Sequence, residues 1–125
     1  METYFSAVRR IAFLDDITVK NVLIHARKLS GIVDVDVACY GDSLLTLGLT
    51  RMALLERGWD LEYVDSWAGE LDLSSEQRQA LRLYTALYCV DFLSEIGQEF
   101  NSNRAPGKEA WQVRHLLQIL ERLLV

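Results

Sequence analysis

Up to about residue 43, short runs of β-branched and other apolar residues are separated by polar residues. This pattern is typical of short strands. It predicts strands at residues 10–14, 21–26 and 32–37. Residues 27–31 are expected to be the loop of a hairpin between the last two strands, with Gly31 at the position that needs a positive φ.

After residue 43 the apolar residues recur at helical spacing almost to the end of the chain. The segments predicted to be helical are 43–57, 61–68, 74–100 and about 111–124, and residues 101–107 are predicted to be a loop. The first helix is apolar around most of its circumference, so we expect it to be buried between neighbours. Gly58 is expected to end this helix. Ser74 and Gln77 have the spacing of a capping box for the third helix.

The predicted third strand alternates strictly between valine and aspartate. Val33, Val35 and Val37 should therefore face the core, while Asp34 and Asp36 lie on the opposite face. At the rise of a strand, the Cα atoms of these two aspartates would be about 6.6 Å apart.

Composition limits what the chain can be. With 125 residues, half of them hydrophobic and only one proline, it should fold as one packed domain of mixed α+β type, mainly α, spanning residues 1–125. Its net charge of −5 argues against general binding to nucleic acid or to anionic membranes. No secretory signal and no apolar run long enough to span a membrane is visible, and Cys39 and Cys89 lie in apolar stretches as reduced thiols would. We therefore expect a cytoplasmic protein.

Four oxygen-bearing side chains suggest a site for a metal ion and phosphate. Asp16 follows the first predicted strand, Asn21 opens the hairpin, and Asp34 and Asp36 lie on the returning strand. Carboxylate and amide oxygens are ligands of the kind that Mg²⁺ prefers, and an aspartate just upstream could orient a hydroxyl nucleophile and accept its proton. The alternative is that these are ordinary solubility residues on an exposed hairpin.

The same residues resemble a known family. The segments D-I-T-V-K-N-V-L-I (residues 16–24) and G-I-V-D-V-D-V-A-C-Y-G-D (residues 31–42) are similar to the aminoglycoside phosphotransferase and choline-kinase-like family. Its pattern is H-G-D-x-x-x-x-N and an apolar strand, followed by I-D-[FW]-E-x-A-x-x-G-D-P and then D-L-A. These are small-molecule kinases with the protein-kinase fold. Order and spacing agree over about thirty residues.

The resemblance implies a role for each matching residue. Asp16 corresponds to the catalytic-loop aspartate, Asn21 and Asp34 to the residues that bind Mg²⁺, and Asp36 to an acidic residue that assists. The implied reaction is transfer of the γ-phosphoryl group of ATP or GTP to a hydroxyl group of a small molecule. The implied architecture is part of a kinase-like C-terminal lobe, with the catalytic loop and metal hairpin at residues 10–42 and a helical subdomain at 43–125.

The chain also departs from the family pattern. Leu14 replaces the histidine, Asp15 the glycine, Ser43 the proline and Thr46 the aspartate of D-L-A. The nucleotide-binding lobe that precedes the catalytic loop in the family has no counterpart here, and residues 2–9 would supply at most a fragment of a helix. We therefore expect the isolated chain to be inactive, as a truncated product, a piece of a split enzyme or a fragment. A non-catalytic kinase-like interaction module is the alternative. The expected partner is a second copy, or a chain that carries the N-terminal lobe.

Other chemically suggestive residues have ordinary explanations. His25 and His115 lack neighbours at zinc-ligand spacing, and Cys39 has no set of partners that would make it a nucleophile. The helical region surrounds the acceptor in the family, so Asp60, Glu62, Asp65 and Glu70 could face a cationic substrate. Their default interpretation is a solvated acidic surface.

Overall fold

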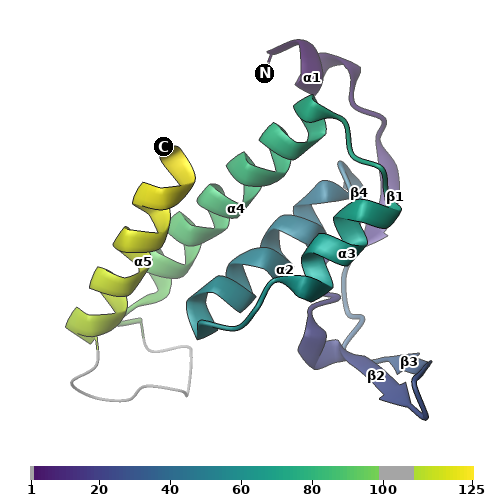
Figure 1. Cartoon of the computed structure of the whole chain (residues 1–125), viewed down its shortest axis with the longest axis horizontal. Coiled ribbons are helices and arrows are strands. Elements are labelled where there is room, and N and C mark those ends of the chain that lie inside the picture. Colours follow the sequence, from purple (N-terminus) through teal and green to yellow (C-terminus); the bar gives the residue numbers. More distant parts are fainter. Residues whose placement is uncertain (1, 99–108) are drawn as a thin grey trace.

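The computed structural model describes residues 2–98 and 109–125 and has a mainly helical α+β fold (Figure 1). The elements in chain order are α1 (Glu2–Ala7), β1 (Ile11–Leu14), the 3-10 turn η1 (Val19–Asn21), β2 (Val22–His25), β3 (Lys28–Ile32), β4 (Ala38–Gly41), α2 (Leu44–Arg57), α3 (Glu62–Glu70), α4 (Ser75–Glu95) and α5 (Glu109–Leu124). After the short helix α1, the strands precede the long helices, as predicted.

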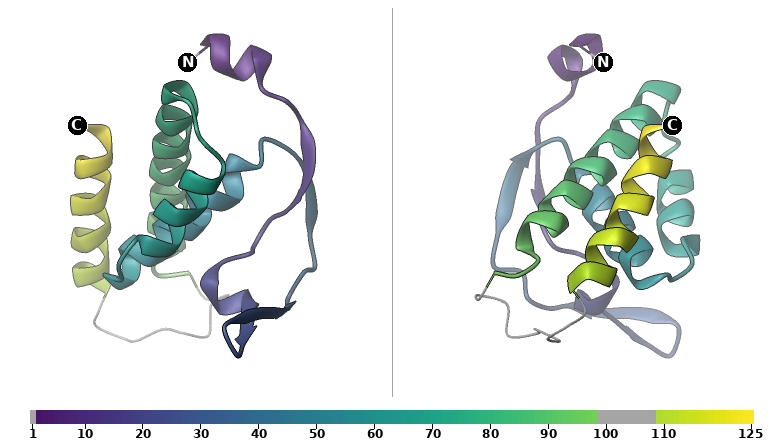
Figure 2. Two further views of the ribbon diagram at one scale, coloured as in Figure 1. Left: turned by 45° about the vertical axis from the view of Figure 1, so that its right-hand side comes forward. Right: turned by 90° about the vertical axis from the view of Figure 1, so that its left-hand side faces the viewer.

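The strands of the described residues form two separate antiparallel pairs, β1 with β4 and β2 with β3. The β1–β4 pair runs from Ile11 opposite Gly41 to Leu14 opposite Ala38. The β2–β3 hairpin projects away from the helices, as Figures 1 and 2 show. One pair thus lies beside the helical body, while the other extends from it.

The prediction that residues 27–31 form the hairpin loop is wrong. Residues 28–32 form β3, and the chain turns at Ala26 and Arg27, both of which have positive φ. Gly31 lies within the strand opposite Leu23, and the register shifts between this pair and the next. The glycine was a misleading signal because two non-glycine residues adopt the left-handed conformation instead.

The prediction of a third strand at 32–37 with a buried valine face is also wrong. The described structure has no strand at 33–37, and Asp34 has a φ of 57°, which breaks the extended backbone. Val33, Val35 and Val37 are 42%, 49% and 55% exposed. Asp34 and Asp36 therefore do not share the face of a regular strand, and β4 (Ala38–Gly41), which we did not predict, follows them.

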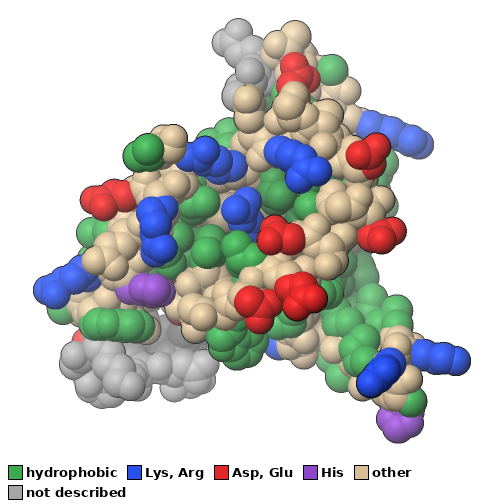
Figure 3. All heavy atoms as spheres, viewed as in Figure 1, with side chains coloured by type: hydrophobic (Ala, Val, Ile, Leu, Met, Phe, Trp, Pro, Cys, Tyr) green, Lys and Arg blue, Asp and Glu red, His purple; other side chains and the backbone are tan. Residues whose placement is uncertain are grey.

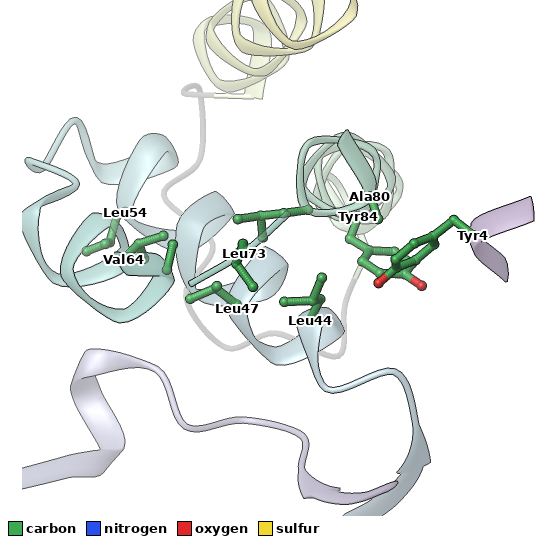
Figure 4. Packing of buried hydrophobic residues seen from close by; sticks show 10 residues of the cluster. Tyr4, Leu44, Leu47, Leu54, Val64, Leu73, Ala80 and Tyr84 are labelled. Atoms are coloured by element: carbon green, nitrogen blue, oxygen red, sulfur yellow. The ribbon is translucent and has the colours of Figure 1, made fainter. Parts of the chain in front are cut away.

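The helical core is built around α2, as predicted. Its side chains pack against α4 on one side and contact α3 and α5 as well. Figure 4 shows the first cluster of buried residues, to which α1, α2, α3 and α4 all contribute. A second cluster joins α5 to α2 and α4 through Met52, Cys89 and Ile119.

The helix signals that depend only on neighbouring residues are confirmed. Gly58 ends α2 with a φ of 66°. The Ser74 hydroxyl accepts from the Gln77 N–H (3.2 Å), and the Gln77 side chain accepts from the Ser74 N–H (2.9 Å). The helix that begins there ends at Glu95, short of the predicted end. Phe100 and the predicted loop at 101–107 lie outside the described residues.

Candidate functional site

The loop between β1 and β2 is held in shape by Asn21. The Asn21 side-chain amide donates to the backbone carbonyl of Asp16 (2.9 Å), and its backbone N–H donates to the carbonyl of Thr18 (2.9 Å). The Asn21 carbonyl accepts from the N–H of Val33 (2.9 Å), on the chain that returns from the hairpin. Asn21 is buried, so these bonds fix the position of Asp16 relative to the base of the hairpin.

Asp16 lies in this loop with a cationic neighbour. The Nζ atom of Lys20 is 3.0 Å from its Oδ2 atom. Burial opposes ionisation of the carboxyl group, but the ion pair with Lys20 and the nearby hydroxyl and N–H groups of Thr18 outweigh it. The pKa of Asp16 is therefore lowered from its ordinary value, and at neutral pH the side chain is a carboxylate that can accept a proton.

Asp16, Asp34 and Asp36 line a common hollow of about 150 Å³, together with Leu14, Asp15, Val35 and Val37. The Asp15 N–H donates to the carbonyl of Val37 (3.3 Å), which ties the loop to the segment that carries the other two aspartates. Asn21 does not line this hollow. In the described part of the chain, no three His, Cys, Asp or Glu side chains are grouped closely enough to hold a metal ion.

The start of the loop is anchored on α2. The Thr46 hydroxyl donates to the carbonyl of Leu14 (2.6 Å), and its own carbonyl accepts from the Thr50 hydroxyl (2.9 Å). Both threonine side chains are fully buried. Thr46 and Leu14 are two of the positions that depart from the family pattern, and here they contact each other directly.

A second hollow, of about 360 Å³, lies on the other side of Asp16, between the loop and the helices α2 and α4. Its charged and aromatic lining residues are Asp15, Asp16, Lys20, Glu56, Arg57, Tyr88, Asp91, Phe92 and Glu95. Acidic side chains outnumber basic ones. Burial chiefly, and then the charges of Asp15, Asp91 and Cys39, raise the pKa of Tyr88 to about 12, so each neighbouring negative charge makes a smaller part of this shift than burial does.

Sequence reasoning missed the residues that the helices contribute to this second hollow. The acidic residues that we singled out for a cationic substrate lie on and before α3 and do not line it. Tyr88, Asp91 and Glu95 recur at spacings of three and four residues, which places them on one face of α4. This spacing could be read from the sequence. That the shared face lines a hollow follows only from the packing of α4 beside the loop.

The Asp42 side chain is buried and has a structural role. Its carboxylate accepts hydrogen bonds from the hydroxyl groups of Tyr4 (2.7 Å) and Tyr84 (2.9 Å) and from the N–H of Leu44 (3.0 Å). Burial and then the hydrogen bond and charge of Asp42 raise the pKa of both tyrosines well above 10.0. This cluster joins α1, α4 and the start of α2, and Figure 4 shows the two rings side by side.

His115 and the two cysteines make the following contacts. His115 stacks on Trp111 with ring centroids 5.1 Å apart, and its Nε2 atom is 3.0 Å from the carbonyl oxygen of Glu56. Cys39 and Cys89 are free thiols. Cys89 is buried and donates to the carbonyl of Leu116 (3.3 Å), and burial raises its pKa.

Comparison of the chain with protein-family models, with curated proteins and with solved structures finds no match. A functional assignment therefore depends on the geometry of the two hollows and on the residues that line them. Among the described helices, none is both long enough and apolar enough to cross a lipid bilayer.

Proposed function

We propose that this chain supplies the catalytic loop and the metal-binding segment of a small-molecule kinase of the aminoglycoside phosphotransferase type. The observation that carries the proposal is the position of Asp16, which with Asp15 lines both hollows and which the resemblance matches to the catalytic aspartate. A base in phosphoryl transfer must face the acceptor hydroxyl on one side and the phosphate on the other. One hollow is lined by the further carboxylates Asp34 and Asp36, which would have to draw closer together to hold a cation, and the other is large enough for part of a small molecule.

In this proposal, Asp16 accepts the proton of the acceptor hydroxyl group. The resemblance assigns Mg²⁺ to Asn21 and Asp34, with Asp36 assisting. In this structure the Asn21 amide donates to the Asp16 carbonyl, and Asn21 does not line the smaller hollow. Asp34 and Asp36 are therefore the residues there whose carboxylates would hold the ion. Mg²⁺ would neutralise charge on the phosphates of ATP or GTP. Lys20 lowers the pKa of Asp16 and so favours its ionised form.

The acceptor would occupy the larger hollow. Its lining is acidic on the α2, α4 and loop sides, and Tyr88 and Phe92 add aromatic surface. Carboxylates and aromatic rings together favour a cation, so the acceptor class that fits best is a hydroxyl compound with an amine or ammonium group.

These 125 residues contain no glycine-rich loop followed by a strand lysine to hold the nucleotide phosphates. We therefore propose that they transfer phosphate only when another segment, in the same or a separate polypeptide, supplies those groups. On their own they are expected to bind metal and acceptor weakly and to be inactive.

A non-catalytic kinase-like interaction module is the second candidate, and position 14 favours it. The family histidine braces the loop through polar contacts of its side chain, whereas Leu14 offers only its backbone carbonyl, which Thr46 holds. A loop fixed in this way keeps its shape without the side chain that the family uses.

Titration with Mn²⁺ separates the two candidates. Paramagnetic broadening of backbone amide signals should be concentrated at residues 15–21 and 34–37 in the wild type and be lost in Asp34→Ala. Asp60→Ala is the matched control, since Asp60 is an exposed aspartate outside the smaller hollow. Equal broadening in all three proteins would remove the metal site and leave the interaction module.

A further inference from the structure

The β2–β3 hairpin exposes more apolar surface than a free hairpin tolerates. Ile24 and Leu29, which lie opposite each other, are each 64% exposed. Leu23, Ile32 and Val33 are also exposed. No other described helix or strand makes more than slight contact with the hairpin. A two-stranded hairpin without a packing partner is marginally stable in water, so this one needs to be covered.

The outer edge of β3 is the place where a further strand can pair. In the described residues β3 has β2 as its single neighbour, so its other edge carries unpaired backbone groups. Left-handed residues bound the extended stretch at both ends, Arg27 with a φ of 61° and Asp34 with a φ of 57°. The stretch between them is centred near Gly31.

Charge is distributed in a self-complementary way about this centre. The hairpin itself carries His25, Arg27 and Lys28 and no acidic residue, while the segment 33–37 carries Asp34 and Asp36 and no basic residue. Figure 3 shows basic and histidine side chains gathered at the tip of the hairpin, with apolar side chains behind them. An edge with a basic end and an acidic end is complementary to its own copy in the antiparallel direction.

We propose that a second copy of the chain covers this edge, with β3 pairing antiparallel to β3 of the other copy about a twofold axis at Gly31. This register places Leu29 opposite Val33 and brings Lys28 beside Asp34, the left-handed residue at the end of the extended stretch, and each pair occurs twice. If the twofold axis moved one residue toward the C-terminus, Lys28 and Leu29 would lie opposite residues beyond the bend at Asp34. The backbone there is no longer extended. A shift toward the N-terminus leaves Lys28 opposite Ile32 and loses the charge pairing.

The exposed apolar area of the hairpin is that of a small dimer interface. Five exposed apolar side chains, those of Leu23, Ile24, Leu29, Ile32 and Val33, present roughly 400 Å² in each copy, which is within the range of the largest apolar patch on an ordinary monomer. A standard interface buries about 800 Å² per partner, so the charged ends and the strand backbone contribute the remainder. The proposed function assigns Mg²⁺ to Asp34, which the dimer pairs with Lys28, so the two proposals compete for this side chain. The cysteine cross-link at Gly31 tests the dimer without changing Asp34.

A cysteine on the twofold axis tests the register. Opposed Cα atoms of antiparallel strands are about 4.5–5.5 Å apart, within the range that a disulfide spans. Gly31 accepts a side chain, because the nearest atom to an added Cβ is Leu23 Cδ1 at 4.0 Å. In a Cys39→Ser background, Gly31→Cys should form a disulfide-linked dimer under mild oxidation, while Ser66→Cys on exposed α3 should not. Equal cross-linking of the two variants would overturn the proposed register.

Charge reversal tests the pairing in solution. Sedimentation equilibrium of the wild type should show a dimer in the micromolar range. Lys28→Asp and Asp34→Lys should each weaken dimerisation at least tenfold, and the double variant should recover most of the loss. All these sites are exposed, and circular dichroism should confirm that each variant is folded. A folded wild-type monomer throughout this range, or a double variant as weak as the singles, would overturn the proposal.

Discussion

The side-chain hydroxyl of Thr46 donates a hydrogen bond of 2.6 Å to the backbone carbonyl of Leu14, thirty-two residues earlier. This bond ties the end of β1 to the first turn of α2, directly before the two aspartates that open the loop. The helical body therefore sets where the loop begins. An aspartate at this position would accept a hydrogen bond from a loop N–H, whereas threonine donates one to a carbonyl group.

Replacing Thr46 with valine should detach the loop from α2. The variant keeps the shape of the side chain but leaves the Leu14 carbonyl without its donor, which should lower the free energy of unfolding by about 1–3 kcal/mol. Urea unfolding measures this change. Thr46→Ser retains the hydroxyl and should lose clearly less, and equal losses in the two variants would contradict a role for the hydrogen bond.

Gly48 allows α2 and α4 to approach closely. A Cβ atom at position 48 would lie 2.8 Å from the Cβ atom of Tyr84 and 3.3 Å from the backbone of α4. Gly48→Ala should therefore force the helices apart and destabilise the protein by about 1–3 kcal/mol. Gly69 is the matched control, because nothing lies within 4 Å of its added Cβ. Gly69→Ala should be neutral or stabilising by about 0.5–1 kcal/mol, since alanine favours the helix.

The features that the sequence predicts correctly are those specified by neighbouring residues. Gly58 and the pair Ser74 and Gln77 carry their helix signals within one turn, and the structure has those ends. The valines at 33–37 illustrate the limit: alternation shows that one face is apolar but not whether anything covers it. The turn at Ala26 and Arg27 has no glycine to mark it.

The candidate site likewise combines features set by neighbouring residues with features set by tertiary packing. The spacing of Asp16 and Asn21 is local, and the structure joins them by a hydrogen bond. Glu56 and Asp91 reach the larger hollow only because α2 and α4 pack beside the loop. Such a contact depends on tertiary packing, which no pattern along the chain determines.

The buried tyrosines should make the protein sensitive to alkali. The pKa values of Tyr4 and Tyr84 are raised by burial and by Asp42, so the folded state keeps them protonated at a pH where the unfolded chain ionises. Stability from this source is fully present below the ordinary value of 10.0 and declines as the pH rises above it. Urea unfolding across this range should show the decline.

A phenylalanine at position 84 should flatten this pH dependence while lowering stability at neutral pH, because one hydrogen bond to Asp42 is lost. Tyr40→Phe is the control, since Tyr40 is 76% exposed. An alkaline profile unchanged by Tyr84→Phe would show that other groups cause the decline.

Lys20 should control the protonation of Asp16. In Lys20→Met the hydrogen bond and the positive charge are removed, so burial should raise the pKa of Asp16 relative to the wild type. Carboxyl carbon chemical shifts followed by NMR during an acid titration measure this directly. Lys28→Met is the matched control, because Lys28 lies on the hairpin and does not line either hollow.

The effect of this ion pair on folding should be small. Because the folded-state pKa of Asp16 is lowered, its stabilising contribution is present above the ordinary value of 3.8 and is lost as the pH falls below it. Lys20 is half exposed, so solvent screening should limit that contribution to less than about 1 kcal/mol. Lys20→Met should therefore change the titration of Asp16 while leaving the urea midpoint at pH 7 nearly unchanged. A large loss of stability would mean that Lys20 supports the loop itself and not only the charge of Asp16.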